Sequence, residues 1–264
     1  MESVAHAVRF DYLNEVLTQH SMTVGLFIPC YVDQFYPQVA IATLELLEKL
    51  GQTVVFPRGQ TCCGQPMANS GFAYLDKGCD KNFVENFGNV DYIVSPSGSC
   101  VLHVKEHLQD ADEKKALHIR RHIYELTEFI VDILAVDNIT ASFPHKVGIH
   151  QSCHGQRGLH LSSMSELVAP SFSKPEKLLA MVKGLQLSKP KRVDECCGFG
   201  GTFCVFEEAV SVKMGKDRIG EHEANTVEFI TGVDVSCLMH MEGILKRNGS
   251  MVKTIHIAEI LNAI

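Results

Sequence analysis

The chain has 264 residues, of which 45% are hydrophobic and 21% charged, and its formal net charge is −7. This composition excludes an intrinsically disordered chain and leaves binding to nucleic acid without electrostatic support. No apolar run reaches the roughly 18 residues that a membrane-spanning helix needs, and the acidic start of the chain does not resemble a signal peptide. We therefore expect a cytoplasmic protein without a transmembrane segment, with residues 1–21 as an N-terminal extension.

Strands and helices are predicted to alternate along the first part of the chain. The periodicity of residues 38–51 predicts a helix that ends at Gly51. Short apolar runs that end near turn residues predict buried strands at 23–29, 53–57 and 91–100. Residues 111–144 contain helical material and are expected to form a helical connection.

The second part of the chain repeats this pattern, with strands predicted at 145–153 and 228–237. Strands that alternate with helices favour parallel sheets covered on both faces. The predicted fold class is therefore α/β, with two pseudo-repeated domains of parallel sheets flanked by helices, related by approximate twofold symmetry. The domains are predicted at 22–110 and 145–264.

Cysteine is unusually frequent, with ten residues in the chain. A protein with a sizeable core in a reducing compartment does not need disulfides, so many thiols indicate metal binding or redox chemistry. Eight of them form two matching sets whose equivalent members lie 123 to 137 residues apart. The sets are Cys30, Cys62, Cys63 and Cys100, and Cys153, Cys196, Cys197 and Cys237.

Each set contains two adjacent cysteines followed by a glycine, Gly64 or Gly198. A disulfide between neighbouring residues is strained, whereas two adjacent thiolates can bind different metal atoms of one cluster. The glycine allows the backbone to turn closely around such a group. Because the carboxyl ends of parallel strands meet at one edge of a sheet, the four thiols of each half are expected to converge. Four thiolates suit an iron–sulfur cluster or zinc.

Several motifs give the chain a resemblance to a known family. They are CYVD (30–33), QTCCGQP (60–66), PSGSC (96–100), HQSCHGQR (150–157), ECCGFGGTF (195–203), CLMH (237–240) and HIAEIL (256–261). Together they resemble the cysteine-rich CCG-domain family of iron–sulfur proteins. This family includes the cysteine-rich subunit of heterodisulfide reductase, the glycolate oxidase iron–sulfur subunit and the lactate utilisation proteins, and the last branch is the most similar. The resemblance covers nearly the whole chain beyond residue 22.

The resemblance implies an iron–sulfur electron-transfer subunit of a complex that oxidises L-lactate, or another 2-hydroxy acid, and that is not active alone. The eight patterned cysteines are then metal ligands, with one 4Fe-4S cluster in each domain. The implied partners are a LutB-like ferredoxin-type iron–sulfur subunit and a LutC-like subunit, from which electrons pass to a respiratory acceptor.

One departure from the family concerns the closing residue of each motif. The cysteine-rich subunit of heterodisulfide reductase has a fifth cysteine where this chain has His103 and His240. We therefore expect a simpler cluster than the noncubane type of that enzyme, with His103, His240, His154 and Cys204 as accessory candidates. Zinc in one of the two sites is an alternative.

Two other functions are consistent with the residues. The adjacent cysteine pairs could cycle between dithiol and disulfide in a thiol–disulfide redox protein, or the thiols could hold zinc in a structural scaffold of the same complex. Cys79 lies outside the repeat and is expected to be a structural thiol. His118, His122 and His222 lie in charged helical stretches and are expected to be solvated.

Overall fold

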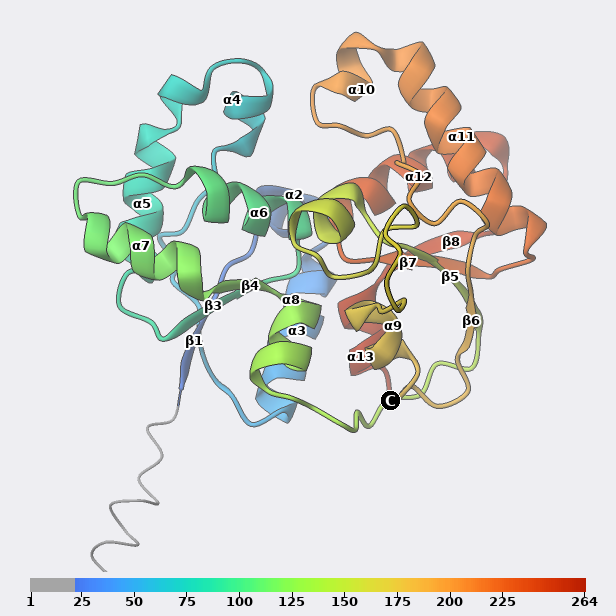
Figure 1. Ribbon diagram of the computed structural model, residues 1–264, viewed down its shortest axis with the longest axis horizontal. Helices are drawn as coiled ribbons and strands as arrows, with labels where there is room; N and C mark the ends of the chain where they lie inside the picture. Colours follow the sequence, from blue (N-terminus) through green and yellow to red (C-terminus); the bar gives the residue numbers. More distant parts are fainter. Residues whose placement is uncertain (1–21) are drawn as a thin grey trace, which may run out of the picture.

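The computed structural model describes residues 22–264, so the predicted extension at 1–21 lies outside the described residues. The described chain forms two similar halves, each a four-stranded parallel sheet flanked by helices (Figure 1). The strand order is β2-β1-β3-β4 in the first half and β6-β5-β7-β8 in the second. Since the second order repeats the first, the predicted α/β fold with two related parallel sheets is confirmed.

The first half begins with a buried strand and ends in a π-helical turn. In chain order its elements are β1 (Thr23–Leu26), α2 (Cys30–Phe35), α3 (Pro37–Lys49), β2 (Thr53–Val55), α4 (Gln65–Asn69), the 3₁₀ turn η1 (Ala73–Leu75), α5 (Lys77–Phe87), β3 (Tyr92–Ser95), α6 (Gly98–His107), α7 (Glu113–His122), β4 (Ile123–Glu125), α8 (Leu126–Glu128) and the π-helical turn η2 (Phe129–Ile133).

The second half follows the same plan. Its elements are β5 (Lys146–His150), the π-helical turn η3 (His154–Gly158), α9 (Lys174–Leu179), β6 (Gln186–Ser188), α10 (Phe203–Phe206), α11 (Glu208–Ala224), β7 (Phe229–Gly232), α12 (Val235–Asn248), β8 (Lys253–His256) and α13 (Ile257–Asn262).

Helix α3 shows how the local sequence sets an element. It starts with Pro37, and a proline is tolerated there because the N–H of the first helical residue makes no hydrogen bond within the helix. It ends at Lys49, shortly before Gly51, where φ is +79°. Its inward-facing residues recur every three or four positions, as the face of a helix packed on a sheet requires. These buried residues are Val39, Ala42, Thr43, Leu46 and Leu47.

The fourth strand of each sheet was missed by the sequence pattern. Residues 123–125, expected to be helical, form β4, which pairs with β3 in the register Ile93↔Ile123. In the second half β8 pairs with β7 in the same way. Both strands are only three or four residues long and continue directly into a helix, so no turn residue separates the two periodicities. The predicted strand at 91–100 also ends early, at Ser95, because helix α6 starts at Gly98.

The two halves are related by approximate twofold symmetry. Helices α3, α8, α9 and α13 lie between the two sheets, where α13 packs on α3 and α8 packs on α9 (Figure 1). Because α8 follows the last strand of the first half and α13 follows that of the second, these two contacts are equivalent. Helix α6 contacts η3, and α12 contacts α2, in the same reciprocal manner. Such an exchange of equivalent partners is the property of a twofold interface.

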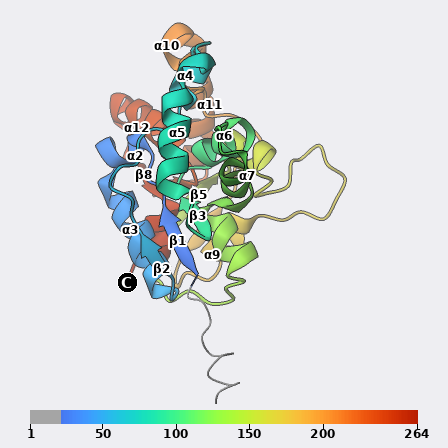
Figure 2. The ribbon, with the colours of Figure 1, turned by 90° about the vertical axis from the view of Figure 1, so that its left-hand side faces the viewer.

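One hydrophobic core runs through both halves. It includes Phe27 and Leu46 in the first half and Ile149 and Leu178 in the second. Figure 1 and Figure 2 both show α4 and α10, one from each half, at the same end of the molecule. Among residues 22–264, none of the helices combines the length and the apolar character that crossing a membrane requires.

The buried carboxyl group of Glu125 makes the stability of the fold dependent on pH. Glu125 is fully buried at the end of β4, and it accepts hydrogen bonds from the backbone N–H groups of Thr127 (2.8 Å) and Glu128 (3.3 Å). Burial raises the pKa of Glu125 to about 8. Since the pKa of an unfolded glutamate is about 4.3, the folded chain holds a proton that the unfolded chain releases between these values. Stability therefore falls as the pH rises through this window.

We expect the Glu125→Gln variant to remove most of this pH dependence. Glutamine keeps an acceptor for the backbone N–H groups but carries no charge, so the variant should exceed the wild type in free energy of unfolding near pH 8, by up to about 4 kcal/mol. Urea unfolding at several pH values between about 5 and 8 measures the difference. Glu85→Gln, at an exposed position of α5, is the control. Parallel pH profiles for wild type and Glu125→Gln would contradict the prediction.

Candidate metal centre

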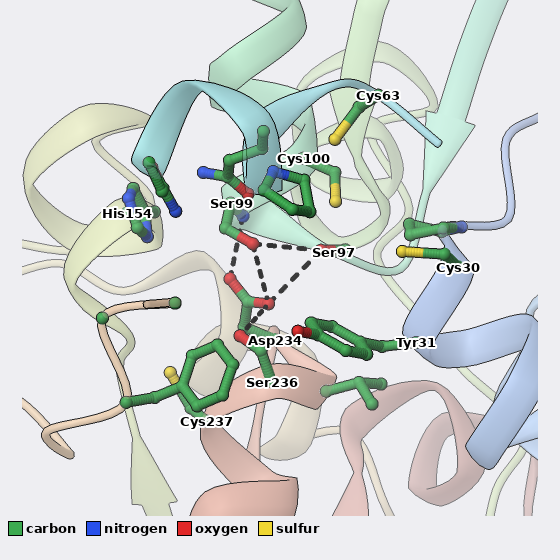
Figure 3. Close-up of a pocket in the computed structure, with 18 of the residues that line it drawn as sticks. Cys30, Tyr31, Cys63, Ser97, Ser99, Cys100, His154, Asp234, Ser236 and Cys237 are labelled. Atoms are coloured by element: carbon green, nitrogen blue, oxygen red, sulfur yellow. Dashed lines mark hydrogen bonds between the residues drawn. The ribbon is translucent and has the colours of Figure 1, made fainter. Parts of the chain in front are cut away.

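All eight patterned cysteines line one cavity between the two halves. The cavity has a volume of about 350 Å³ and also receives Tyr31, Ser97, His154, Phe199 and Asp234. Figure 3 shows side chains from both halves around this space, with Cys30, Cys63 and Cys100 at one end and Cys237 at the other. The structure therefore gathers the four cysteines of each half, and it also places the two sets of four beside each other.

The positions of the cysteines follow from the parallel sheets. Cys30 is the first residue of α2, directly after β1, and Cys100 lies in the first turn of α6, directly after β3. Cys62 and Cys63 lie in the loop that follows β2. These loops all leave the carboxyl edge of the first sheet, where ligand sites of parallel sheets form. The second half repeats the arrangement with its own four cysteines, so the expected convergence at the strand ends is confirmed.

Cys100 and Cys237 lie near the N-termini of helices, where the electrostatic field favours negatively charged groups. The sequence pattern placed Cys100 and Cys237 in turns, but each is the third residue of a helix, α6 or α12. Backbone N–H groups at a helix N-terminus are unpaired within the helix and carry partial positive charge. This end of a helix stabilises thiolates and the anionic groups that thiolates bind.

The four thiols of the first half form a continuous chain of contacts. The sulfur of Cys30 donates to that of Cys62 at 3.8 Å. Hydrogen bonds from Cys30, from Cys63 and from the backbone N–H of Gly64 hold the pKa of Cys62 far below its usual value. The pKa of Cys63 is raised by its hydrogen bond with Cys100, by that with Cys62 and by burial. Among these four thiols, a thiolate therefore forms most easily at Cys62, which lies between Cys30 and Cys63 in the row of contacts.

The second half contains the same chain of thiols. Cys153 and Cys197 donate to Cys196, as does the backbone N–H of Gly198 at 3.3 Å, and these bonds hold the pKa of Cys196 far below its usual value. Cys197 also interacts with Cys237, and its pKa is raised. The two halves thus offer the same set of sulfur donors in the same order.

The glycine after each cysteine pair is required by the backbone. Gly64 and Gly198 have φ values of +90° and +89°, in the left-handed region that side chains disfavour. A Cβ on Gly198 would also lie 2.5 Å from the carbonyl oxygen of Ser211. These turns point the two neighbouring thiols into the shared cavity, which explains the repeated Cys-Cys-Gly sequence.

A buried carboxylate separates the two cysteine sets. Asp234 is 1% exposed and lies at the N-terminus of α12. Its Oδ2 accepts from the backbone N–H of Ser99 at 2.8 Å, and its Oδ1 accepts from the hydroxyl groups of Ser97 (3.3 Å), Ser99 (3.1 Å) and Ser236 (3.1 Å) (Figure 3). One side chain of the second half thereby caps helix α6 of the first.

Asp234 and its serines were not singled out in the sequence. The signal was present, because Ser97-Gly98-Ser99-Cys100 and Asp234-Val235-Ser236-Cys237 are equivalent segments of the repeat. Comparison of the two segments identifies Asp234 as the acidic counterpart of Ser97. The two residues also form an antiparallel bridge with each other, which places them near the twofold axis.

The accessory candidates lie at different distances from the cavity. His154 lines it, whereas His103, His240 and Cys204 are not among its lining residues. Nε2 of His240 lies 3.4 Å from the hydroxyl oxygen of Ser211, and the Cys204 thiol donates to the carbonyl oxygen of Gly201 at 3.1 Å. Burial lowers the pKa of both His103 and His240. The two histidines occupy equivalent helical positions, one turn after the last cysteine of each set.

Cys79 and His222 lie outside the cavity that the two cysteine sets share. Cys79 does not line the cavity, and its Cβ lies 3.6 Å from the site that a Cβ on Gly64 would occupy. His222 was expected to be solvated, and this expectation is wrong, because its side chain is fully buried. Charged residues of α11 such as Lys213 face solvent, but His222 and Arg218 lie on the buried face of that helix. His222 packs against Gly148 of the second sheet.

The donor set fits a thiolate-bound metal group. Each half offers four sulfurs that are linked by pairwise contacts, at the strand ends of its own sheet, beside helix N-termini. Soft thiolate sets of this kind select iron–sulfur clusters or zinc. The residues that would hold such a group in the first half are Cys30, Cys62, Cys63 and Cys100, and their counterparts would hold it in the second.

Comparison with known proteins places this architecture among cysteine-rich proteins. The family model described as "Cysteine-rich domain" (CCG) matches residues 24–105 and again 147–242. Lactate utilization protein A of Bacillus subtilis is 42% identical over 247 residues, which cover 92% of this chain and 100% of that protein. Lactate utilization protein A of Geobacillus kaustophilus is 40% identical, with 92% and 99% covered.

A solved structure shares the fold at low sequence identity. The crystal structure of a hypothetical protein from Helicobacter pylori matches 90% of this chain and 48% of its own chain, with a TM-score of 0.50 and 14% identity. This likeness concerns the fold alone.

Proposed function

This chain belongs to the cysteine-rich CCG-domain family, in the branch of the lactate utilization proteins A, and on that premise we propose that it is an iron–sulfur electron-transfer subunit of a complex that oxidises L-lactate or a related 2-hydroxy acid. The observation that carries the proposal is the shared cavity, which is lined by both complete sets of four cysteines. A scaffold that holds zinc for stability needs no second site beside the first, whereas electron transfer needs redox groups close together.

The residues that would hold the clusters are the eight patterned cysteines, four in each half. A bound iron–sulfur cluster supplies one-electron transfer. The chain itself supplies the thiolates, the helix N-termini that stabilise negative charge and the buried walls that limit access of water to the sulfurs. The network of Asp234 and the serines fixes the N-termini of α6 and α12 relative to each other, and with them the separation of the two sites.

The oxidation of a 2-hydroxy acid to a 2-oxo acid releases two electrons and two protons. Two redox groups held in one cavity would supply the one-electron chemistry that matches this two-electron oxidation. As partners we propose a LutB-like ferredoxin-type iron–sulfur subunit and a LutC-like subunit, by analogy with the naming of the relatives as lactate utilization protein A. A respiratory acceptor is the proposed destination of the electrons.

Metal and sulfide analysis of the whole chain tests the proposal. Protein purified under anaerobic conditions is expected to be brown and to contain about eight iron and eight sulfide ions per chain, as two 4Fe-4S clusters require. Reduction should produce an electron paramagnetic resonance (EPR) signal of iron–sulfur type. A colourless chain with stoichiometric zinc would support the scaffold function instead, and a metal-free chain with thiol–disulfide activity would support the redox-thiol function. Either result contradicts the proposal.

A further inference from the structure

Three buried polar side chains lie behind the second cysteine set, and we call His150, Arg218 and His222 the polar trio. Their side chains are 1%, 0% and 0% exposed. Both ring nitrogens of each histidine, and Nε and Nη2 of Arg218, have no hydrogen-bond partner among the described residues. Buried donors without acceptors are costly, so these unpaired groups call for an explanation.

His150 joins the polar trio to the cysteines. It is the last residue of β5, and one of its ring nitrogens lies within 4.8 Å of the sulfurs of Cys197 and Cys237. The guanidinium of Arg218 disfavours a second positive charge on either imidazole, and a neutral imidazole keeps one N–H to donate. Arg218 carries the positive charge of the polar trio.

The first half has three aromatic rings at the equivalent place, and we call Phe27, Phe83 and Phe87 the aromatic trio. Their ring centroids lie 4.6 to 5.8 Å apart. Phe27 stands three residues before Cys30 at the end of the first strand, as His150 stands three residues before its own cysteine. The other two rings lie four residues apart on α5, as the other two members of the polar trio do on α11.

Two equivalent glycines support this correspondence. Gly25 is the third residue of β1 and Gly148 the third residue of β5. A Cβ on Gly25 would lie 3.0 Å from the ring of Phe87, and a Cβ on Gly148 would lie 2.3 Å from Nδ1 of His222. Each glycine thus makes room for a ring from the following long helix. The same place in the repeat is apolar in one half and polar in the other.

The Arg218 cation belongs to a network of two arginines and two glutamates. Its Nη1 lies 3.5 Å from Oε2 of Glu221, and the charge of Glu195 also acts on it. Arg192 binds both carboxylates, at 2.7 Å to Glu221 and 2.9 Å to Glu195. The side chain of Glu221 is 16% exposed, whereas that of Arg218 is fully buried. Solvent and the second arginine therefore weaken the attraction between Arg218 and these carboxylates. The buried charge of Arg218 also attracts negative charge at Cys197 in the cysteine site.

We propose that the polar trio makes the two sites unequal, so that the second half holds the more easily reduced cluster. This inference rests on the proposed function, in which each set of cysteines holds an iron–sulfur cluster. Uptake of one electron adds a negative charge to a cluster, and the Arg218 cation stabilises that charge. The N–H of His150 can donate to the sulfurs of the same site. The aromatic trio offers the first site neither a charge nor a donor. At equilibrium an electron delivered to the cavity therefore resides at the second site.

Two single-cluster proteins test the inequality directly. Cys63→Ser leaves the site of the second half intact, and Cys197→Ser leaves that of the first. Reductive titration with dithionite, followed by EPR spectroscopy, measures the reduction potential of the remaining cluster in each. We expect the cluster in Cys63→Ser to be reduced at the higher potential. Equal potentials or the reverse order would overturn the inference, whereas absence of iron from the wild type would instead refute the proposed function.

Substitutions within the polar trio identify the cause. In the Cys63→Ser protein, Arg218→Met and His150→Phe are each expected to lower the potential of the remaining cluster, and His150→Phe introduces the residue that the first half uses. Lys213→Met removes an exposed charge from the same helix and should leave the potential unchanged. In the Cys197→Ser protein none of these changes should shift it. If both variants kept the cluster and its reduction potential were unchanged, the proposal would be overturned. If Arg218→Met fails to fold, the reduction potential of His150→Phe by itself tests the proposal.

Discussion

Replacement of Cys197 by serine is expected to remove the cluster of the second half and to keep that of the first. Cys197 is 1% exposed and contacts the thiols of Cys196 and Cys237. A buried hydroxyl is a harder and less acidic donor than a thiol, so it is a poor substitute in a set of soft ligands. The iron and sulfide content should fall to about half, measured by chemical analysis of protein purified anaerobically.

The shared cavity makes the control for this variant important. Cys79→Ser changes a cysteine that does not line the cavity and should leave the iron content at the wild-type value. Cys63→Ser should mirror Cys197→Ser, with loss from the first half. If Cys197→Ser lost all of its iron while remaining folded, the eight cysteines would act as one site rather than two, and the assignment of one cluster to each half would be wrong.

The Asp234→Ala variant is expected to lose about 2–4 kcal/mol of stability, because several buried donors lose their charged acceptor and one such loss costs about 1–3 kcal/mol. The change leaves the Ser99 N–H and three buried hydroxyl groups without their acceptor. It also removes the cap of helix α6, which the carboxylate provides from the opposite half. Chemical denaturation of the loaded protein measures the loss. The cavity residues come from both halves, so cluster retention should decline as well.

Asp234→Asn separates the charge from the hydrogen bonds. The amide oxygen can still accept from Ser99, so we expect this variant to lose clearly less stability than Asp234→Ala. Loss of less than about 1 kcal/mol in Asp234→Ala, the value of one ordinary hydrogen bond, would show that the network contributes little to joining the halves.

Much of the candidate site could be predicted because it is written in short segments. Each Cys-Cys-Gly sequence predicts a tight turn with two thiols, and φ is indeed positive at Gly64 and Gly198. The apolar runs before Cys30 and Cys153 predict buried strands, and β1 and β5 lie there. The repeat at 123 to 137 residues predicts two related units, which the matching strand orders confirm.

Other features had no local signal that was strong enough. Strand β4 follows α7 without a turn residue, so the helical period extended through Ile123 in the prediction, although pairing with β3 holds it in the sheet. His222 looked solvated because its neighbours on α11 are charged, yet the packing of that helix on Gly148 buries it. In both cases contacts with a distant segment outweigh the local pattern.

The residues along the chain specify two cysteine sets, their spacing and the strands that carry them, because periodicity and turn chemistry act over a few neighbouring positions. That both sets line one cavity, with Asp234 between them and different trios behind them, follows from the packing of α13 on α3 and of α8 on α9. Those contacts join segments far apart along the chain and depend on the shapes of whole helices. No short window of sequence contains that information.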